Sequence, residues 1–123
     1  MRLKREGVIE MKIRIRQADK LFSEYLRKKI GSCEICGKKE SIQVSHFYGR
    51  RHENTRFSEE NCDILCYYHH QNFGENPATY VDWKKAKLGE KRFKLLMLSA
   101  NQYKKKDDKL IILWLKKELK ELT

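Results

Sequence analysis

One pair of cysteines and one cysteine–histidine pair are spaced as ligands of a single metal ion. Cys33 and Cys36 enclose two residues in CEIC, and Cys66 and His69 enclose two in CYYH. A tight turn can bring the first pair to one ion. Residues three apart on a helix share a face, so the second pair can reach the same ion. Three thiolates and one imidazole form the closed tetrahedral ligand set of a structural zinc site. We therefore predict that Zn2+ binds these four residues and stabilises the fold.

Other interpretations of this cluster stay open on the sequence. His70 lies four residues after Cys66 and could take the place of His69. Cys62 could compete for the ion, although its spacing is less usual and we expect it to be buried in a strand. All four cysteines could instead be reduced and buried without metal. Disulfides are not expected, because the basic N-terminal stretch lacks the apolar core of an export signal.

A second set of polar residues, His46, Asn61 and His70, could carry out phosphodiester hydrolysis. If His69 binds zinc, His70 is turned by about 100° around the helix and faces another environment. His46 ends the stretch SIQVSH and Asn61 directly precedes CDILC, so both can meet His70 where two strands and a helix join. His46 can act as general base because an imidazole titrates near neutral pH. His70 can hold a divalent ion against a phosphate oxygen, and Asn61 can bind that ion or fix the geometry around His46.

Each of these three residues also has a purely structural interpretation. His46 could be a hydrogen-bonded strand histidine, Asn61 a loop-capping amide, and His70 a fourth zinc ligand. Hydrolysis of a phosphodiester needs an activated water, a cation on the developing charge and a stabilised leaving group. Because the three residue types together supply these needs, the sequence favours the nuclease.

Two short strands and one helix must position these residues. Alternating apolar and polar residues predict a strand over 41–47, and residues 62–66 could be its partner across a long loop. A helix is predicted to begin near Cys66 and to carry YYHHQNF. The metal ligands and the second set of residues would then lie on one strand–strand–helix unit.

Helices are predicted on both sides of this unit. Apolar residues at helical spacing predict an amphipathic helix over 17–30 that a glycine ends. Asn76 and Pro77 are typical of an N-cap and a first helical residue, and they begin the helix PATYVDWKKAKL. Two more helices are predicted for EKRFKLLMLSANQY and DDKLIILWLKKELKEL, the last of them capped by Asp107 or Asp108.

The charge of the chain favours a polyanionic partner. Its 123 residues carry a net charge of +11, spread as +6 over 1–30, −3 over 31–82 and +8 over 83–123. Basic flanks of this size favour nucleic acid over an anionic membrane. No apolar run approaches the ~18–20 residues of a membrane span. We therefore expect a soluble, intracellular, single-domain protein whose flanks bind nucleic acid, with an affinity that falls steeply with salt.

This pattern resembles the HNH, or ββα-metal, endonucleases. The match runs from C-x2-C through a strand ending in His46, then Asn61, to L-C-x2-H-H ending in His70. It is similar in particular to the phage NinG (Rap) recombination nucleases, over roughly residues 20–103. The stretches that carry this second likeness are LFSEYLRKK, SHFYGRR, TRF, EEN and NPATYVDWKKAKLG.

The resemblance implies a metal-dependent DNA endonuclease of the bacterial or phage-infected cytoplasm. It implies His46 as the base, His70 as a ligand of Mg2+ or Mn2+, and Asn61 in positioning. For the phage group it further implies action on branched DNA during recombination.

Two departures from the family pattern, and three arginines, bear on this function. Ser45 stands where many HNH proteins have Asp or His as a further ligand of the catalytic metal, and His69 stands where the phage group more often has Cys. Arg50, Arg51 and Arg56 lie in the long loop and could contact phosphates beside the scissile bond, with Arg50 matching the family's loop arginine best. They could also be solvated charges or ion-pair partners of nearby glutamates.

The predicted fold is α+β, with a small zinc-stapled ββα-metal (HNH, treble-clef-like) core between basic helices. It is predicted to be one domain over 1–123, with an arm and helix over 1–30, the core over 31–76 and helices over 77–123. Two other functions stay open, a restriction- or homing-like nuclease on duplex DNA and a non-catalytic zinc module that binds nucleic acid. The apolar C-terminal helix could form a homodimer interface or pack on its own domain.

Overall fold

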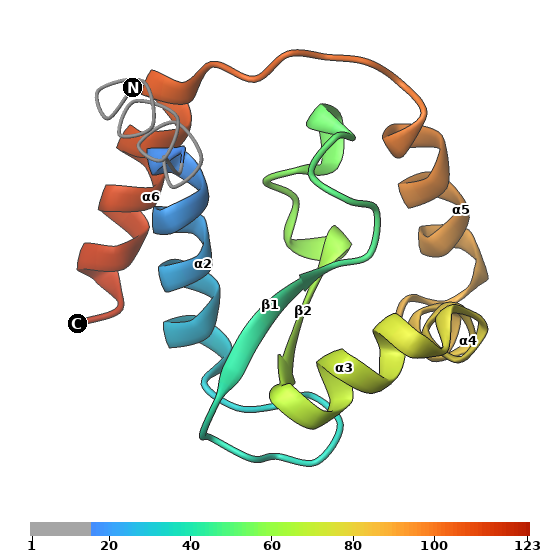
Figure 1. Cartoon of the computed structure of the whole chain (residues 1–123). Helices are drawn as coiled ribbons and strands as arrows, with labels where there is room; N and C mark the ends of the chain where they lie inside the picture. The colour runs from blue at the N-terminus through green and yellow to red at the C-terminus, as the bar shows by residue number, and fades with distance from the viewer. Residues whose placement is uncertain (1–15) are drawn as a thin grey trace, which may run out of the picture.

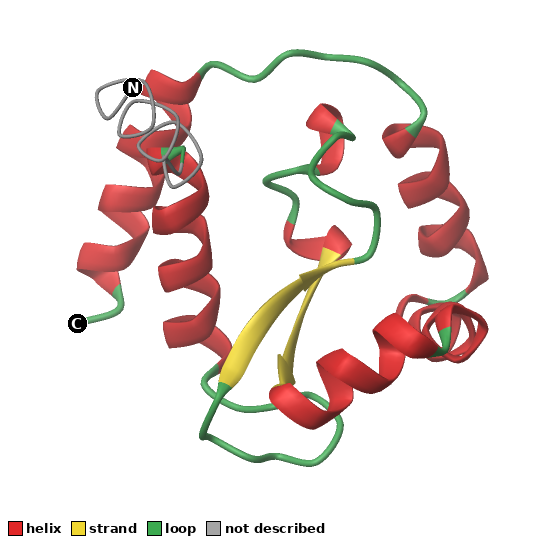
Figure 2. Cartoon of the chain, in the orientation of Figure 1, coloured by secondary structure: helices red, strands yellow, loops and turns green. Residues whose placement is uncertain are grey.

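The computed structural model describes residues 16–123, in which five α-helices flank a two-stranded antiparallel sheet (Figures 1 and 2). The predicted arm over the first fifteen residues lies outside this described part. None of the described helices is long and apolar enough to cross a membrane. The elements in order are α2 Gln17–Ile30, β1 Ile42–His46, η1 Glu53–Thr55, η2 Glu59–Asn61, β2 Cys62–Cys66, α3 Tyr67–Glu75, α4 Pro77–Leu88, α5 Glu90–Ala100 and α6 Asp108–Glu121.

The sheet is a β1–β2 pair whose register places Ile42 opposite Cys66 and His46 opposite Cys62. Alternate residues of a strand point to opposite faces. One face packs on the α2–α6 side, where Ile64 is buried in the core, and the other packs on the α3–α4 side, where Leu65 is buried. Because both faces are covered, β2 is buried at all five of its residues.

Helices α2 and α6 lie side by side and form the larger core (Figure 1). Phe22 and Leu26 of α2 and Leu115 of α6 are all buried there. Gly31, with φ 76°, ends α2 in the left-handed conformation that glycine adopts at low cost. Asp107 caps α6 by accepting hydrogen bonds from the backbone N–H groups of the next turn. The apolar C-terminal helix therefore packs on its own domain, while Leu110 and Leu113 stay exposed.

The second core joins α3 and α4 to the sheet. Phe73 of α3 stacks on Tyr80 of α4, with ring centroids 4.5 Å apart. Pro77 begins α4 as predicted, but Asn76 does not cap it, because its side-chain amide donates to the Asn72 carbonyl of α3 at 3.0 Å. The Asn76 side chain thus supplies a hydrogen bond to the C-terminal end of α3 instead of capping the first turn of α4.

Candidate metal centre and histidine cleft

Cys33, Cys36, Cys66 and His69 come together in one cluster, with all ligand atoms within 4.8 Å of one another. The Sγ atom of Cys66 lies 3.3 Å from Nδ1 of His69 and 3.9 Å from Sγ of Cys36, and Sγ of Cys33 lies 3.7 Å from the same Nδ1. Bond lengths of tetrahedral zinc place two sulfurs about 3.8 Å apart and a sulfur and a nitrogen about 3.6 Å apart. The cluster therefore fits a structural ion such as Zn2+, in its donor chemistry and in its spacing.

Local backbone geometry presents the first cysteine pair. Gly37 directly follows CEIC and has a φ of 78°, so the chain turns sharply there without strain. The N–H of Gly37 donates to the Cys33 carbonyl at 2.9 Å, and the N–H of Cys33 donates to the Lys38 carbonyl at 2.8 Å. Glu34 anchors this turn to β2, because its backbone N–H donates to the Ile64 carbonyl at 2.8 Å and its carboxylate accepts from the Ile64 N–H at 2.6 Å.

The electrostatics of the cluster favour a thiolate at Cys33. Burial opposes the charge, but backbone N–H groups of Cys36, Cys66 and Ile35 point at the sulfur and lower its pKa to about 6. A thiolate is the form that binds metal. The alternative ligands lie elsewhere: Cys62 is buried in β2, where burial raises the pKa of its thiol, and His70 is not part of the cluster.

His46 and His70 line a separate cavity of about 530 Å³, which we call the histidine cleft. Ser45 and Tyr80 also line it, so the cleft lies between the end of β1 and helices α3 and α4. Nδ1 of His70 is buried and has no hydrogen-bond partner among residues 16–123. A buried imidazole nitrogen without a partner is costly unless a ligand or water satisfies it. His70 therefore contributes a buried ring nitrogen that lacks a hydrogen-bond partner within the described residues.

His46 is held at the end of β1 by a hydrogen bond of its ring. Its Nε2 lies 3.2 Å from the Arg56 carbonyl, and its ring lies against Phe22 of α2. A carbonyl only accepts hydrogen bonds, so Nε2 carries the proton and Nδ1 carries the free lone pair. Burial, and next the charge of Arg50, lower the pKa of His46 to about 4. His46 is thus neutral at physiological pH, the form that can accept a proton.

Asn61 is fully buried, and both ends of its side-chain amide are used. Its Oδ1 accepts from the Tyr48 N–H and its Nδ2 donates to the Tyr48 carbonyl, each at 2.9 Å. The amide therefore fixes the chain that leaves β1 two residues after His46. Of the two predicted roles, this geometry corresponds to positioning, because a metal would have to displace the Tyr48 N–H from Oδ1.

A buried polar cluster under the histidine cleft is absent from the sequence predictions. Asp63 of β2 is fully buried and accepts from Lys84 at 2.8 Å, Lys87 at 2.6 Å and the Tyr80 hydroxyl at 2.7 Å. The same hydroxyl lies 3.0 Å from Oγ of Ser45. Burial lowers the pKa of Lys84 and raises that of Tyr80. An aspartate within the apolar run CDILC is the sequence signal that could have indicated this cluster.

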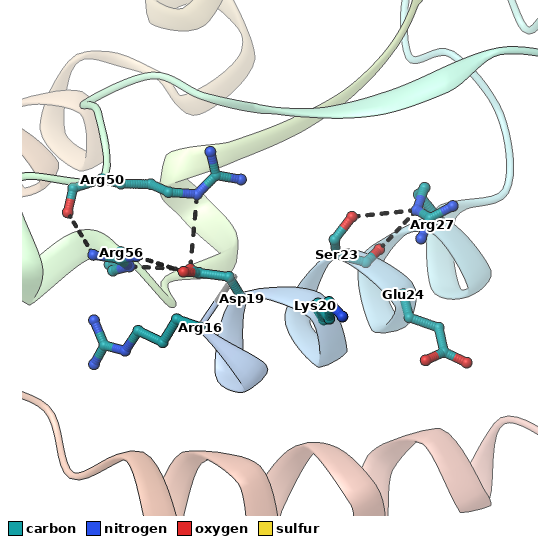
Figure 3. Close-up of a pocket in the computed structure, with 8 residues that line it drawn as sticks. All are labelled: Arg16, Asp19, Lys20, Ser23, Glu24, Arg27, Arg50 and Arg56. Carbon is teal, nitrogen blue, oxygen red and sulfur yellow. Dashed lines mark hydrogen bonds and ion pairs between the residues drawn. The ribbon is translucent and has the colours of Figure 1, made fainter. Parts of the chain in front are cut away.

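The three loop arginines occupy different environments. Arg56 is mostly buried and pairs with Asp19 of α2, and it also donates to the Arg50 carbonyl (Figure 3). Arg50 is half exposed, and its Nε lies 3.7 Å from the same carboxylate. Arg51 is exposed and lines a different cavity together with Ala100 at the end of α5. Arg56 therefore matches the ion-pair alternative, and Arg50 and Arg51 remain accessible to a ligand.

The adjacent Tyr67 and Tyr68 do not pack in a core. Both lie on the outer face of α3 and are mostly exposed. Their rings are therefore accessible to solvent instead of contributing to the second core.

In comparisons with known proteins, no family model, curated protein or solved structure matches the chain.

Proposed function

We propose that this protein is an HNH-type DNA endonuclease that uses a divalent metal and is held together by structural zinc. The observation that carries the proposal is that the adjacent histidines of α3 have different surroundings, and that one of them shares its surroundings with the histidine of β1. His69 turns toward three sulfurs, and His70 turns into a cleft that His46 also lines. An ion bound by His69 would therefore fix helix α3, and with it the position of His70, the next residue, in the cleft.

His46 is the proposed general base. Its Nδ1 has a free lone pair because Nε2 donates to the Arg56 carbonyl. The near-neutral titration expected for His46 is wrong for the folded protein, because burial lowers its pKa to about 4. The ring is therefore unprotonated at working pH, as a base must be, but it is a weaker base than a free imidazole. Asn61 is a positioning residue in this scheme, since it fixes the backbone that follows His46 through Tyr48.

His70 is the proposed ligand of Mg2+ or Mn2+, and its unpartnered Nδ1 is the observation that fits such an ion. When bound, a divalent ion would stabilise the charge that develops on a phosphate during hydrolysis. Oδ1 of Asn61 already accepts from the Tyr48 N–H. Because the Tyr80 hydroxyl donates to Asp63, the Ser45 hydroxyl donates to Tyr80 and remains a weak ligand at best, and no carboxylate of the described residues lines the cleft. Water and phosphate oxygens would complete the coordination, as is usual for Mg2+.

The experiment that tests this function is a cleavage assay with zinc-loaded protein on a four-way DNA junction and a linear duplex of matched sequence. Cleavage that requires added Mg2+ or Mn2+ would support the proposal, and faster cutting of the junction would support branched DNA as the substrate. Cutting of the duplex at one defined site would favour a restriction- or homing-like nuclease instead.

A non-catalytic module that binds nucleic acid is the second candidate. The observation that favours it is the side chain of Ser45, which is buried at 4% exposure and hydrogen-bonded to Tyr80. The cleft then offers one histidine for a divalent ion, where related sites have a further ligand. Folded, zinc-loaded protein that binds both DNA substrates but cuts neither with either metal would establish this candidate.

A further inference from the structure

A cavity of about 660 Å³ lies along α2 and beside the loop that follows β1 (Figure 3). We call it the α2 cleft. Five of the eight residues that line it are lysine or arginine, and two are acidic. None of the eight is a ligand of the candidate zinc cluster or a residue of the histidine cleft.

The two acidic residues of the α2 cleft are already neutralised. Asp19 pairs with Arg56, and Glu24 lies 3.3 Å from Lys28 one helical turn away. Arg16 is also engaged, because it pairs with Glu53 and Asp108, which strongly raises its pKa. These ion pairs lie within the protein. The net positive charge of the cleft therefore comes from its other lysine and arginine side chains.

Lys20, Arg27 and Arg50 carry that excess. Neither Lys20 nor Arg27 has a carboxylate within ion-pair distance in the part of the chain that the structure describes, and Arg50 is 53% exposed with only a 3.7 Å contact to Asp19. Lys20, Ser23 and Arg27 follow one another at helical spacing, so they share one face of α2 over roughly 10 Å. Arg27 also donates to Oγ of Ser23 at 3.3 Å, which holds the guanidinium along the helix (Figure 3). Such a row of cations and a hydroxyl matches the spaced phosphates of a nucleic-acid backbone.

The α2 cleft adjoins the proposed base. Arg56 lines the α2 cleft, and its backbone carbonyl accepts a hydrogen bond from Nε2 of His46 at 3.2 Å. Arg50 lines the α2 cleft and lies close enough to His46 to oppose its protonation. A strand whose phosphate reaches His46 would therefore have neighbouring phosphates within reach of α2.

We propose that Lys20, Arg27 and Arg50 form a binding site for DNA backbone phosphates that flank the phosphate at His46. The inference rests on the proposed function in one respect, which is that the polyanion is DNA. It makes α2 a substrate-binding helix in addition to a core helix. It also implies that the contact is independent of base sequence, because phosphates carry no sequence information.

The test compares Lys20→Gln/Arg27→Gln with the control Lys38→Gln/Lys39→Gln. Both double variants remove two exposed positive charges, but Lys38 and Lys39 lie in the loop before β1, in the net acidic part of the chain and outside the basic flanks. Binding of a labelled DNA duplex is measured by fluorescence anisotropy at several salt concentrations, with full-length, zinc-loaded protein and no added Mg2+ or Mn2+. Circular dichroism and zinc content confirm that both variants are folded.

We expect the slope of log K against log [salt] to fall by about 1.8 in magnitude for the α2 variant, which corresponds to a loss of about sixtyfold in affinity at 0.1 M salt relative to 1 M. The control should keep a slope within about 0.5 of the wild type. Equal slopes for the two variants would overturn the proposal.

The outcome is separable from that of the proposed function, because binding is measured without cleavage. If the wild type never cuts DNA but the α2 variant loses its slope, the α2 site stands and the endonuclease falls. If the wild type cuts DNA but the two variants bind alike, the endonuclease stands and the α2 site falls.

Discussion

Asn61 holds the backbone of Tyr48 at both its N–H and its carbonyl, each at 2.9 Å, from a position with no solvent exposure. Two hydrogen bonds in a buried site fix the chain just after the proposed base His46. These hydrogen bonds connect Asn61, at the end of the long loop, to the segment that directly follows β1. It makes Asn61 important for stability as well as for the geometry of the histidine cleft.

Asn61→Ala should lower the free energy of unfolding by about 2–4 kcal/mol, because two buried backbone groups lose their partner. Urea denaturation of zinc-loaded protein measures the change. Asn101→Ala is a suitable control, since that amide is exposed and donates only to the Met97 carbonyl, and it should cost less than about 0.5 kcal/mol. A loss at Asn61 no larger than at Asn101 would show that the Tyr48 contact contributes little.

Substitutions at the two adjacent histidines should separate zinc binding from the cleft. His69→Ala should lose zinc or hold it much more weakly, because His69 lies with the three sulfurs. His70→Ala should keep one zinc per chain, and so should Cys62→Ala. Zinc content by native mass spectrometry gives the answer directly. Retention of zinc by His69→Ala together with its loss from His70→Ala would reverse the assignment.

The buried pair of Asp63 and Lys84 should be strongly coupled. Both side chains are fully buried and lie 2.8 Å apart, so removing Asp63 leaves Lys84 as a buried charge without a partner, whereas removing Lys84 leaves Asp63 its contacts with Lys87 and Tyr80. We expect Asp63→Asn to destabilise the protein by about 3–5 kcal/mol, and Lys84→Met to destabilise it less. A double-mutant cycle of the two substitutions should give a coupling energy of about 1–3 kcal/mol by urea denaturation. Additive effects of the two substitutions would contradict this interaction.

The ring of His46 should not titrate near neutral pH. Burial, and then the charge of Arg50, lower its pKa to about 4, against about 6.5 in an unfolded chain. Its ring proton shifts in NMR should therefore stay constant between about pH 5.5 and 8. Because the folded-state pKa is depressed, the linked stability is present above about pH 6.5 and is lost as pH falls toward 4. In His46→Gln this contribution to acid destabilisation should disappear, while a titration midpoint near 6.5 in the wild type would refute the buried environment.

The helices, the strands and the zinc cluster were predictable because their signals are local. Residues 62–66 carry a strand pattern, and the two Cys/His pairs have metal-ligand spacing whatever the rest of the fold. Helical periodicity left both His69 and His70 within reach of Cys66, and the structure places His69 in the cluster. The predicted elements, and the meeting of the four Cys/His residues in a group that could hold a metal ion, are confirmed for the described residues.

Features that depend on distant contacts were not predictable. Asp63 is neutralised from α4, twenty-one residues later, and the sequence gives no measure of which lysines turn toward it. Asn76 has the sequence context of an N-cap, yet its amide turns back to α3. The exposure of Tyr67 and Tyr68 depends on which face of α3 meets the second core. The α2 cleft likewise needs the loop after β1 to return to a helix more than twenty residues earlier.

A cleavage assay that compares the wild type with His46→Ala decides whether His46 is the base. Wild type and His46→Ala, each shown to hold one zinc, are incubated with the four-way junction and the matched duplex in Mg2+ or Mn2+. We expect the wild type to cut, and we expect His46→Ala to retain zinc and DNA binding but to cut at least about a hundredfold more slowly. Cleavage at the wild-type rate by His46→Ala would contradict the assignment of His46 as the base and, with it, the proposed use of the histidine cleft.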